Sequence, residues 1–271
     1  MTGPTLFTVG TVLYAVSAYL YLVGWLARER LARDWAPRVL LGAVAVYAVS
    51  MGVRWAVYGF PFLTLREVLS VYAWVLALLY LVLERRFGYT IIGVFVTPVG
   101  SLMILAASLL PPAQTPLLPL LRSPWLMAHT GVFFAAYAAF TLAFAAALAY
   151  LLQDRSLRRK QLAWRLPPLS VMDNLSLWLV TVGLVLMTAA IVTGSAWADR
   201  TWGRPWVWQP KQILSLVTAG IYGAYLLVRH VAHWAVRRAL WIVVIGFISV
   251  LATFIGADML APTGLHSFLL R

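Results

Sequence analysis

Long apolar runs alternate with short polar segments along the whole chain. Eight runs are close to or above the roughly 18 residues that cross a bilayer as an α-helix. The spans predicted from this pattern are Thr5–Ala27, Val39–Tyr58, Leu65–Leu83, Tyr89–Leu110, Leu126–Leu152, Leu175–Ala198, Ile213–Arg229 and Ala239–Asp258. The pattern therefore predicts an all-α fold, a polytopic membrane bundle of about eight helices in a single integral membrane domain over residues 1–271.

The composition agrees with a membrane environment. Hydrophobic residues make up 63% of the chain, charged residues 11%, and the mean hydropathy is +0.87. Cysteine is absent, which excludes disulfides, thiolate metal sites and thiol exchange by this chain. No basic segment precedes the first apolar run, and no convincing cleavage site follows it, so we expect a retained helix rather than a signal peptide.

The net charge of +13 is distributed unevenly between the two sides of the predicted bundle. One set of loops carries Arg28, Arg30, Arg33, Arg38, Arg85, Arg86, Arg155, Arg158, Arg159, Lys160, Arg165, Arg229, Arg237 and Arg238. The opposite side has Arg66, Arg122, Arg200, Arg204, Lys211 and Arg271, and Arg54 lies inside the second span. The positive-inside rule makes the first set cytoplasmic, so we expect both termini on the non-cytoplasmic side of a bacterial cytoplasmic membrane.

The same distribution excludes some functions. The basic residues sit in short loops with no aromatic-interleaved basic domain, so we expect the lipid bilayer and not nucleic acid as the surroundings. The chain has no GxxxxGK[ST] or GxGxxG phosphate-binding loop, which excludes an ATP-driven pump within it.

Two of the four histidines fall on the predicted outer side. His129 lies at the outer end of the fifth span, and His266 lies in the tail after the eighth. Two imidazoles at one interface can supply both axial ligands of a haem iron. The simpler alternative is that each histidine only anchors a helix end at the interface.

The loop after the sixth span is rich in tryptophan. Trp202, Trp206 and Trp208 fall within seven residues, flanked by Gly203, Pro205 and Pro210. An interfacial aromatic belt explains the tryptophans without any ligand. However, glycine and proline fix a bent backbone that a belt does not need, and a rigid aromatic shelf suits a flat apolar ring system.

Cationic residues on the same side can pair with the propionates of a haem. Lys211 and Arg66 are candidates, and Arg54 is the most informative because an arginine within a membrane span is costly without a partner. Snorkelling to the nearby interface is the alternative for Arg54. Glu67 is its candidate partner.

At this point the sequence resembles a known family. The segment Trp202–Gln212 is similar to the tryptophan-rich WGxxWxWDPKE signature of the haem-handling proteins of cytochrome c assembly, which include CcsA, CcmC and CcmF. Further segments resemble the family in the CcsA order, over roughly residues 60–267. They are Phe60-Pro61 with Leu65-Arg66-Glu67, Trp125–His129 with Tyr137–Phe140, Asp173–Ser176 and Gly264–Ser267.

The resemblance implies a function and a set of site residues. His129 and His266 would be the axial ligands of a non-covalent haem b, and Trp202, Trp206 and Trp208 would lie against the porphyrin. Gly203, Pro210 and Lys211 belong to the same segment. Haem would be presented for attachment to apocytochrome c with a CcsB-like membrane partner, as in a subunit of a haem lyase, and no residue of this chain stands out as a catalytic group.

Two departures from the family pattern leave a second branch open. Gln209 and Gln212 stand where the signature has Asp and Glu, and Leu227 stands where CcsA-type proteins tend to carry histidine. HemX-like proteins, which have the same eight-span plan, affect the level of glutamyl-tRNA reductase in haem biosynthesis. A haem or solute transporter is the weaker alternative, because every acidic residue lies at or near a span end.

Overall fold

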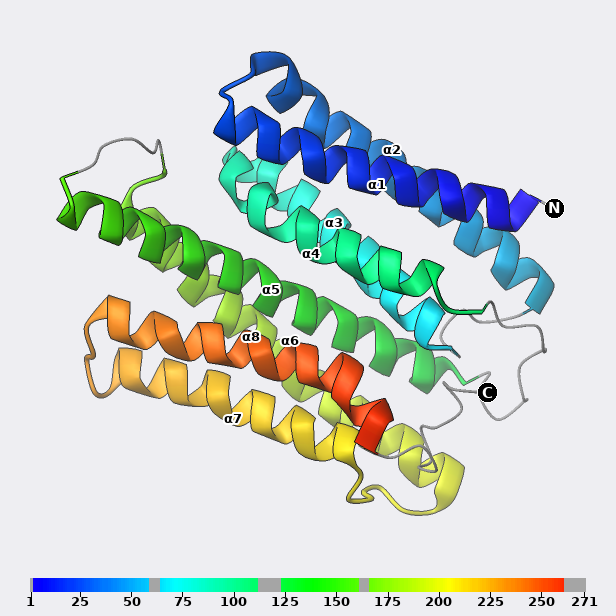
Figure 1. Ribbon diagram of the computed structural model, residues 1–271. Coiled ribbons are helices and arrows are strands. Elements are labelled where there is room, and N and C mark those ends of the chain that lie inside the picture. The colour runs from blue at the N-terminus through cyan, green and yellow to red at the C-terminus, as the bar shows by residue number, and fades with distance from the viewer. Residues whose placement is uncertain (1, 59–63, 112–122, 161–165, 261–271) are drawn as a thin grey trace. The chain divides into compact units, whose positions relative to one another are not determined.

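The computed structural model describes residues 2–58, 64–111, 123–160 and 166–260. Within these ranges the chain forms eight helices and no strand, as the apolar pattern predicts (Figure 1). The helices are α1 (Thr2–Leu26), α2 (Arg30–Tyr58), α3 (Leu65–Phe87), α4 (Thr90–Ser108), α5 (Pro124–Arg158), α6 (Leu169–Trp202), α7 (Pro210–His230) and α8 (Val236–Leu260). All eight are long and apolar enough to cross a membrane, so the protein is a multi-pass membrane protein.

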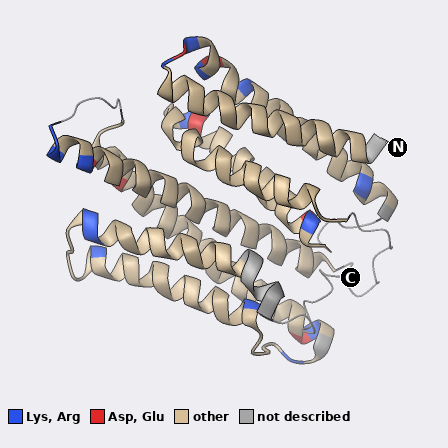
Figure 2. Ribbon diagram, in the orientation of Figure 1, with Lys and Arg blue, Asp and Glu red and all other residues tan. Residues whose placement is uncertain are grey.

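Charged residues gather at the helix ends and in the connecting segments (Figure 2). Several helices extend beyond the predicted apolar spans because they continue into these charged ends. Helix α5 runs on to Arg158 and α6 begins at Leu169, which makes them 35 and 34 residues long. At 1.5 Å per residue each measures about 50 Å, more than the ~30 Å of hydrocarbon that a bilayer offers.

The helices form two compact units. Unit 1 contains α1 to α4, and unit 2 contains α5 to α8. In unit 1, α1 packs on α2 and α4, and α3 packs on the same two helices. In unit 2, α5 packs on α6 and α8, and α7 packs on the same two. Each unit is therefore a four-helix bundle in which every helix packs mainly on two others.

Glycines opposite aromatic rings bring the helices of each unit close together. In unit 2 a Cβ added to Gly183 of α6 would lie 2.5 Å from Cε1 of Phe140 of α5. The Phe140 ring is fully buried and stacks on Tyr222 of α7, with centroids 3.8 Å apart. Gly183 thus provides the space in which a ring shared by three helices is packed.

We predict that Gly183→Ala destabilises unit 2 by about 1–3 kcal/mol, because the added methyl group overpacks the ring of Phe140. Thermal unfolding of the purified protein in detergent measures the effect. Gly220→Ala is the matched control, since a Cβ at Gly220 of α7 meets no atom within 4 Å. Equal melting temperatures for the two variants would contradict this account of the α5–α6 contact.

Candidate functional site

His129 lies in the second turn of α5, which begins with Pro124 at a position that suits proline because the first N–H groups of a helix have no helical partner. Its Nδ1 is 2.7 Å from the carbonyl oxygen of Ala190 in α6. A carbonyl oxygen only accepts, so Nδ1 carries the hydrogen and donates it. The other ring nitrogen, Nε2, makes no hydrogen bond with the described residues and presents a lone pair when the imidazole is neutral.

The backbone of α6 determines where this ring lies. A Cβ added to Gly194 would lie 2.7 Å from both Cε1 and Nδ1 of His129. Any side chain at this position would push the imidazole away, so the ring rests directly on the helix surface. The Ala190 carbonyl and Gly194 together fix the tautomer and the orientation of His129, as the partners around metal-binding histidines do.

The ends of α5 and α6 meet one turn beyond His129. The guanidinium carbon of Arg200 in α6 lies 4.5 Å from the ring centroid of Trp125 in α5, a distance typical of a cation–π contact. Helix α6 then ends at Trp202, whose side chain lies outside the described residues. Gly203 follows with φ of 66°, and its N–H donates to the Asp199 carbonyl at 2.8 Å. The left-handed conformation explains why the loop begins with glycine.

The described tryptophans of the loop have different surroundings. Trp208 is 73% exposed, while Trp206 is half-buried, and the two rings meet edge to face with centroids 5.6 Å apart. The indole Nε1 of Trp206 is buried and has no hydrogen-bond partner among the described residues. An N–H donor in this position favours a ligand with an acceptor group.

Helix α7 begins at the end of this loop with Pro210 as its first residue and Lys211 as its second. Gln209 is the N-cap, and Gln212 three residues later closes a capping box. The Gln209 N–H donates to Oε1 of Gln212 at 3.3 Å. The two residues that replace the acids of the family signature therefore occupy helix-capping positions, which amides can also fill.

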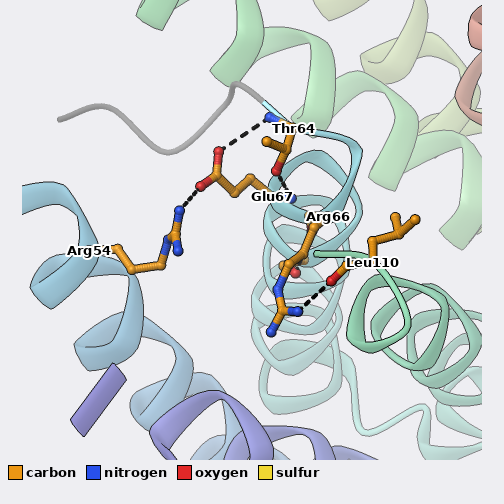
Figure 3. Close-up of polar contacts among 6 residues, drawn as sticks. Arg54, Thr64, Arg66, Glu67 and Leu110 are labelled. Atoms are coloured by element: carbon orange, nitrogen blue, oxygen red, sulfur yellow. Dashed lines mark hydrogen bonds and ion pairs between the residues drawn. The ribbon is translucent and has the colours of Figure 1, made fainter. Parts of the chain in front are cut away.

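The remaining candidates lie in unit 1 and form a polar cluster of their own (Figure 3). Arg54 of α2 makes an ion pair with Glu67 of α3, the partner suggested by the sequence. The Thr64 N–H donates to the second carboxylate oxygen of Glu67 at 3.3 Å, within the capping box that starts α3. Arg66 donates to the Leu110 carbonyl at 2.6 Å, and its guanidinium lies over the ring of Phe7, 4.2 Å from the centroid.

Not every predicted site residue can be placed. His129, Gly203, Trp206, Trp208, Pro210 and Lys211 belong to unit 2, and Arg54, Arg66 and Glu67 belong to unit 1. His266 lies outside the described residues. The Ala190 carbonyl and Gly194 were not predicted, because an alanine and a glycine inside an apolar run give no signal that they contact a histidine 61 residues away from Ala190.

The family model and the sequence relatives of this chain indicate the same family. A family model described as Cytochrome C assembly protein matches residues 62–265. The cytochrome c biogenesis protein CcsA of Synechococcus sp. (strain CC9605) is 33% identical over 260 residues, covering 84% of this chain and 85% of that protein. CcsA of Guillardia theta is 30% identical over 249 residues, covering 83% and 82%.

The fold is also found in a solved structure. The protein titled Cytochrome c Heme Lyase CcmF superimposes with a TM-score of 0.73 and 14% sequence identity, over 98% of this chain and 49% of that one. The present chain thus spans about half of that protein, and the likeness concerns the fold alone. The sequence relatives support the assembly branch, and the HemX alternative receives no support from them.

Proposed function

The chain belongs to the cytochrome c assembly protein family, and from that premise we propose that it holds haem at the membrane surface for attachment to an apocytochrome c. The observation that carries the proposal is the state of His129. Its Nδ1–H donates a hydrogen bond to the Ala190 carbonyl. Nε2 is therefore the ring nitrogen that would bind a metal. Haem is the cargo in this proposal, held by the protein as haem b without a covalent bond.

The residues of unit 2 fit such a cargo. In this proposal Nε2 of His129 and the imidazole of His266 would both bind the iron. The rings of Trp202, Trp206 and Trp208 would lie against the porphyrin. The buried Nε1–H of Trp206 and the ammonium of Lys211, in the first turn of α7, suit the haem carboxylates.

Taken by itself, unit 1 contains a second cationic group that we propose as a partner for a carboxylate, Arg66 of the polar cluster. Arg66 has donors beyond the one that contacts Leu110. Arg54 and Glu67 hold each other in place, so in this proposal they order the surface around Arg66.

The chemistry of attachment is the addition of two cysteine thiols of the apocytochrome to the haem vinyl groups, each sulfur and its hydrogen adding across one double bond. The part of this chain is to hold and orient haem, which is catalysis by positioning. A CcsB-like membrane protein would deliver the apocytochrome, and the complex of the two would act as a cytochrome c haem lyase.

The charge distribution supports an orientation with both termini on the non-cytoplasmic side of a bacterial cytoplasmic membrane. We predict that a phosphatase reporter fused after Arg271 is active, whereas one fused in the connection between α7 and α8 is inactive, because the enzyme matures only outside the cytoplasm. Phosphatase activity in whole cells measures this. The reverse pattern would place the tryptophan loop on the cytoplasmic side.

The central prediction concerns the two histidines. Protein purified from haem-replete cells should show a Soret band, and His129→Ala and His266→Ala should each lose it or shift it, because one axial ligand is removed. His230→Ala at the C-terminal end of α7 is the control and should leave the spectrum unchanged. In a strain that lacks the native gene, the two ligand variants should also fail to restore covalent c-type cytochromes.

Three outcomes would count against the proposal. If the wild-type protein contained no haem, haem would not be its cargo. If both histidine variants kept an unchanged spectrum, His129 and His266 would not be the iron ligands. Normal c-type cytochromes with altered glutamyl-tRNA reductase abundance after deletion of the gene would favour a regulatory protein.

Gly194 gives a test of the geometry around His129. We predict that Gly194→Ala weakens haem binding by about 10- to 100-fold, the range typical of lost support behind a metal ligand. The methyl group would displace the imidazole from the Ala190 carbonyl. Haem titration followed by absorbance measures this, with Gly131→Ala on α5 as the control because its Cβ meets no atom within 4 Å. Equal affinities would show that the α6 backbone does not position the ligand.

A further inference from the structure

Unit 1 contains a buried acid for which the haem-binding proposal has no use. Glu84 lies near the C-terminal end of α3 and is 8% exposed. The other buried acids of the described residues each lie beside an arginine: Glu67 pairs with Arg54, and Asp154 with Arg158. No described lysine or arginine makes an ion pair with Glu84.

Two buried tyrosines lie beside Glu84, where the other buried acids have an arginine. The hydroxyl of Tyr21, from α1, donates to Oε2 of Glu84 at 2.6 Å. Tyr80, one turn earlier on α3, is fully buried and meets the ring of Tyr21 edge to face, with centroids 5.6 Å apart. The second carboxyl oxygen of Glu84, Oε1, is buried and has no hydrogen-bond partner in the described part of the chain.

Two arginines lie next to Glu84 in the sequence, but neither makes an ion pair with it. Arg85 and Arg86 directly follow Glu84, and both side chains are exposed. Successive residues of a helix point about 100° apart, so the acid faces the interior while the two cations face away. Basic residues are therefore available next to Glu84 in the sequence, but the helix geometry directs Glu84 toward the tyrosines instead.

Helix α4 completes the site with a glycine and a backbone carbonyl. A Cβ at Gly93 would lie 2.3 Å from the Tyr80 hydroxyl and 2.8 Å from Cε1 of Tyr21, so only glycine leaves room for both rings. The Tyr80 hydroxyl lies 3.4 Å from the Thr90 carbonyl. Three helices thus build this site: Tyr21 of α1 and Tyr80 of α3 are the titratable groups beside Glu84, and the first turn of α4 packs on the two tyrosines.

If Glu84 were ionised in this position, its negative charge would be buried with no cation beside it. Binding a proton removes the charge, and Oε1 is the oxygen open to the proton because Oε2 accepts from Tyr21. We propose that Glu84 is a proton-binding site, with the proton on Oε1 at neutral pH and the Tyr21 hydroxyl holding Oε2. The site takes up a proton from water to form the neutral acid and releases it as the pH rises.

Infrared spectroscopy of the full-length protein in lipid vesicles at pH 7 tests the proposal. The spectrum of the wild type should contain the C=O stretch of a protonated carboxylic acid that is missing from Glu84→Gln. This band should shift in D2O, fade at high pH and return when the pH is lowered. A difference spectrum with only carboxylate bands would overturn the proposal.

Glu67→Gln is the matched control on the same helix, because Glu67 is ion-paired with Arg54. Its difference spectrum should show loss of carboxylate bands and no protonated-acid band. Such a band in the Glu67 variant would mean that the method does not separate the two acids, and the assignment to Glu84 would fall.

A second measurement uses the unaltered protein, in case Glu84→Gln does not fold. Dicyclohexylcarbodiimide is an apolar reagent to which a protonated carboxyl adds its O–H across a C=N bond, and the adduct rearranges to a stable acylurea with no atom lost. Peptide mass spectrometry should find the label on Glu84 and not on Glu67. A label on Glu67 alone, or on neither residue in detergent-solubilised protein, would contradict a proton on Glu84.

Discussion

Inside a bilayer a polar side chain is stabilised where the protein supplies its hydrogen-bond partner, because lipid tails supply none. This constraint explains the main polar features of the structure. His129 donates to a backbone carbonyl of α6, Arg54 meets Glu67, and Glu84 accepts from Tyr21. In each case the polar group of one helix is held by a group of a neighbouring helix. The candidate functional positions are therefore also positions at which neighbouring helices contact each other.

The parts of the fold that follow from local chemistry could be predicted from the sequence, and the parts that follow from packing could not. Apolar length alone predicts eight spans, and the pairing of Arg54 with Glu67 follows from the cost of an arginine within the membrane. The hydrogen bond from His129 to Ala190 depends on the register between α5 and α6, which no pattern in either helix specifies. Gly194 is one of several glycines in apolar runs, and only the packed structure distinguishes it.

The amides Gln209 and Gln212 illustrate how a departure from a family signature can preserve a structural role. The acids of the signature correspond in this sequence to the N-cap and third position of α7, where a carboxylate can accept from backbone N–H groups. The amides fill the same two positions at the start of α7, and Gln212 accepts from the Gln209 N–H. What the substitution removes is two negative charges beside the tryptophan loop. The proposed cargo, haem, has two carboxylates of its own, and for such a molecule the loss of these charges would lower repulsion.

Small residues opposite rings are the packing device that the two units have in common. Tyr80 rests on Gly93 and Phe140 on Gly183, and in each case a Cβ would collide with the ring. The imidazole of His129 rests on Gly194 in the same way. Close approach of backbones at small residues is how membrane helices gain packing energy when lipid is as apolar as the side chains. At Gly194 the same close approach brings Nδ1 of His129 within hydrogen-bond distance of the Ala190 carbonyl. Because that hydrogen bond uses Nδ1, Nε2 is the ring nitrogen left for a metal. A contact that elsewhere only packs two helices thus also orients the imidazole here.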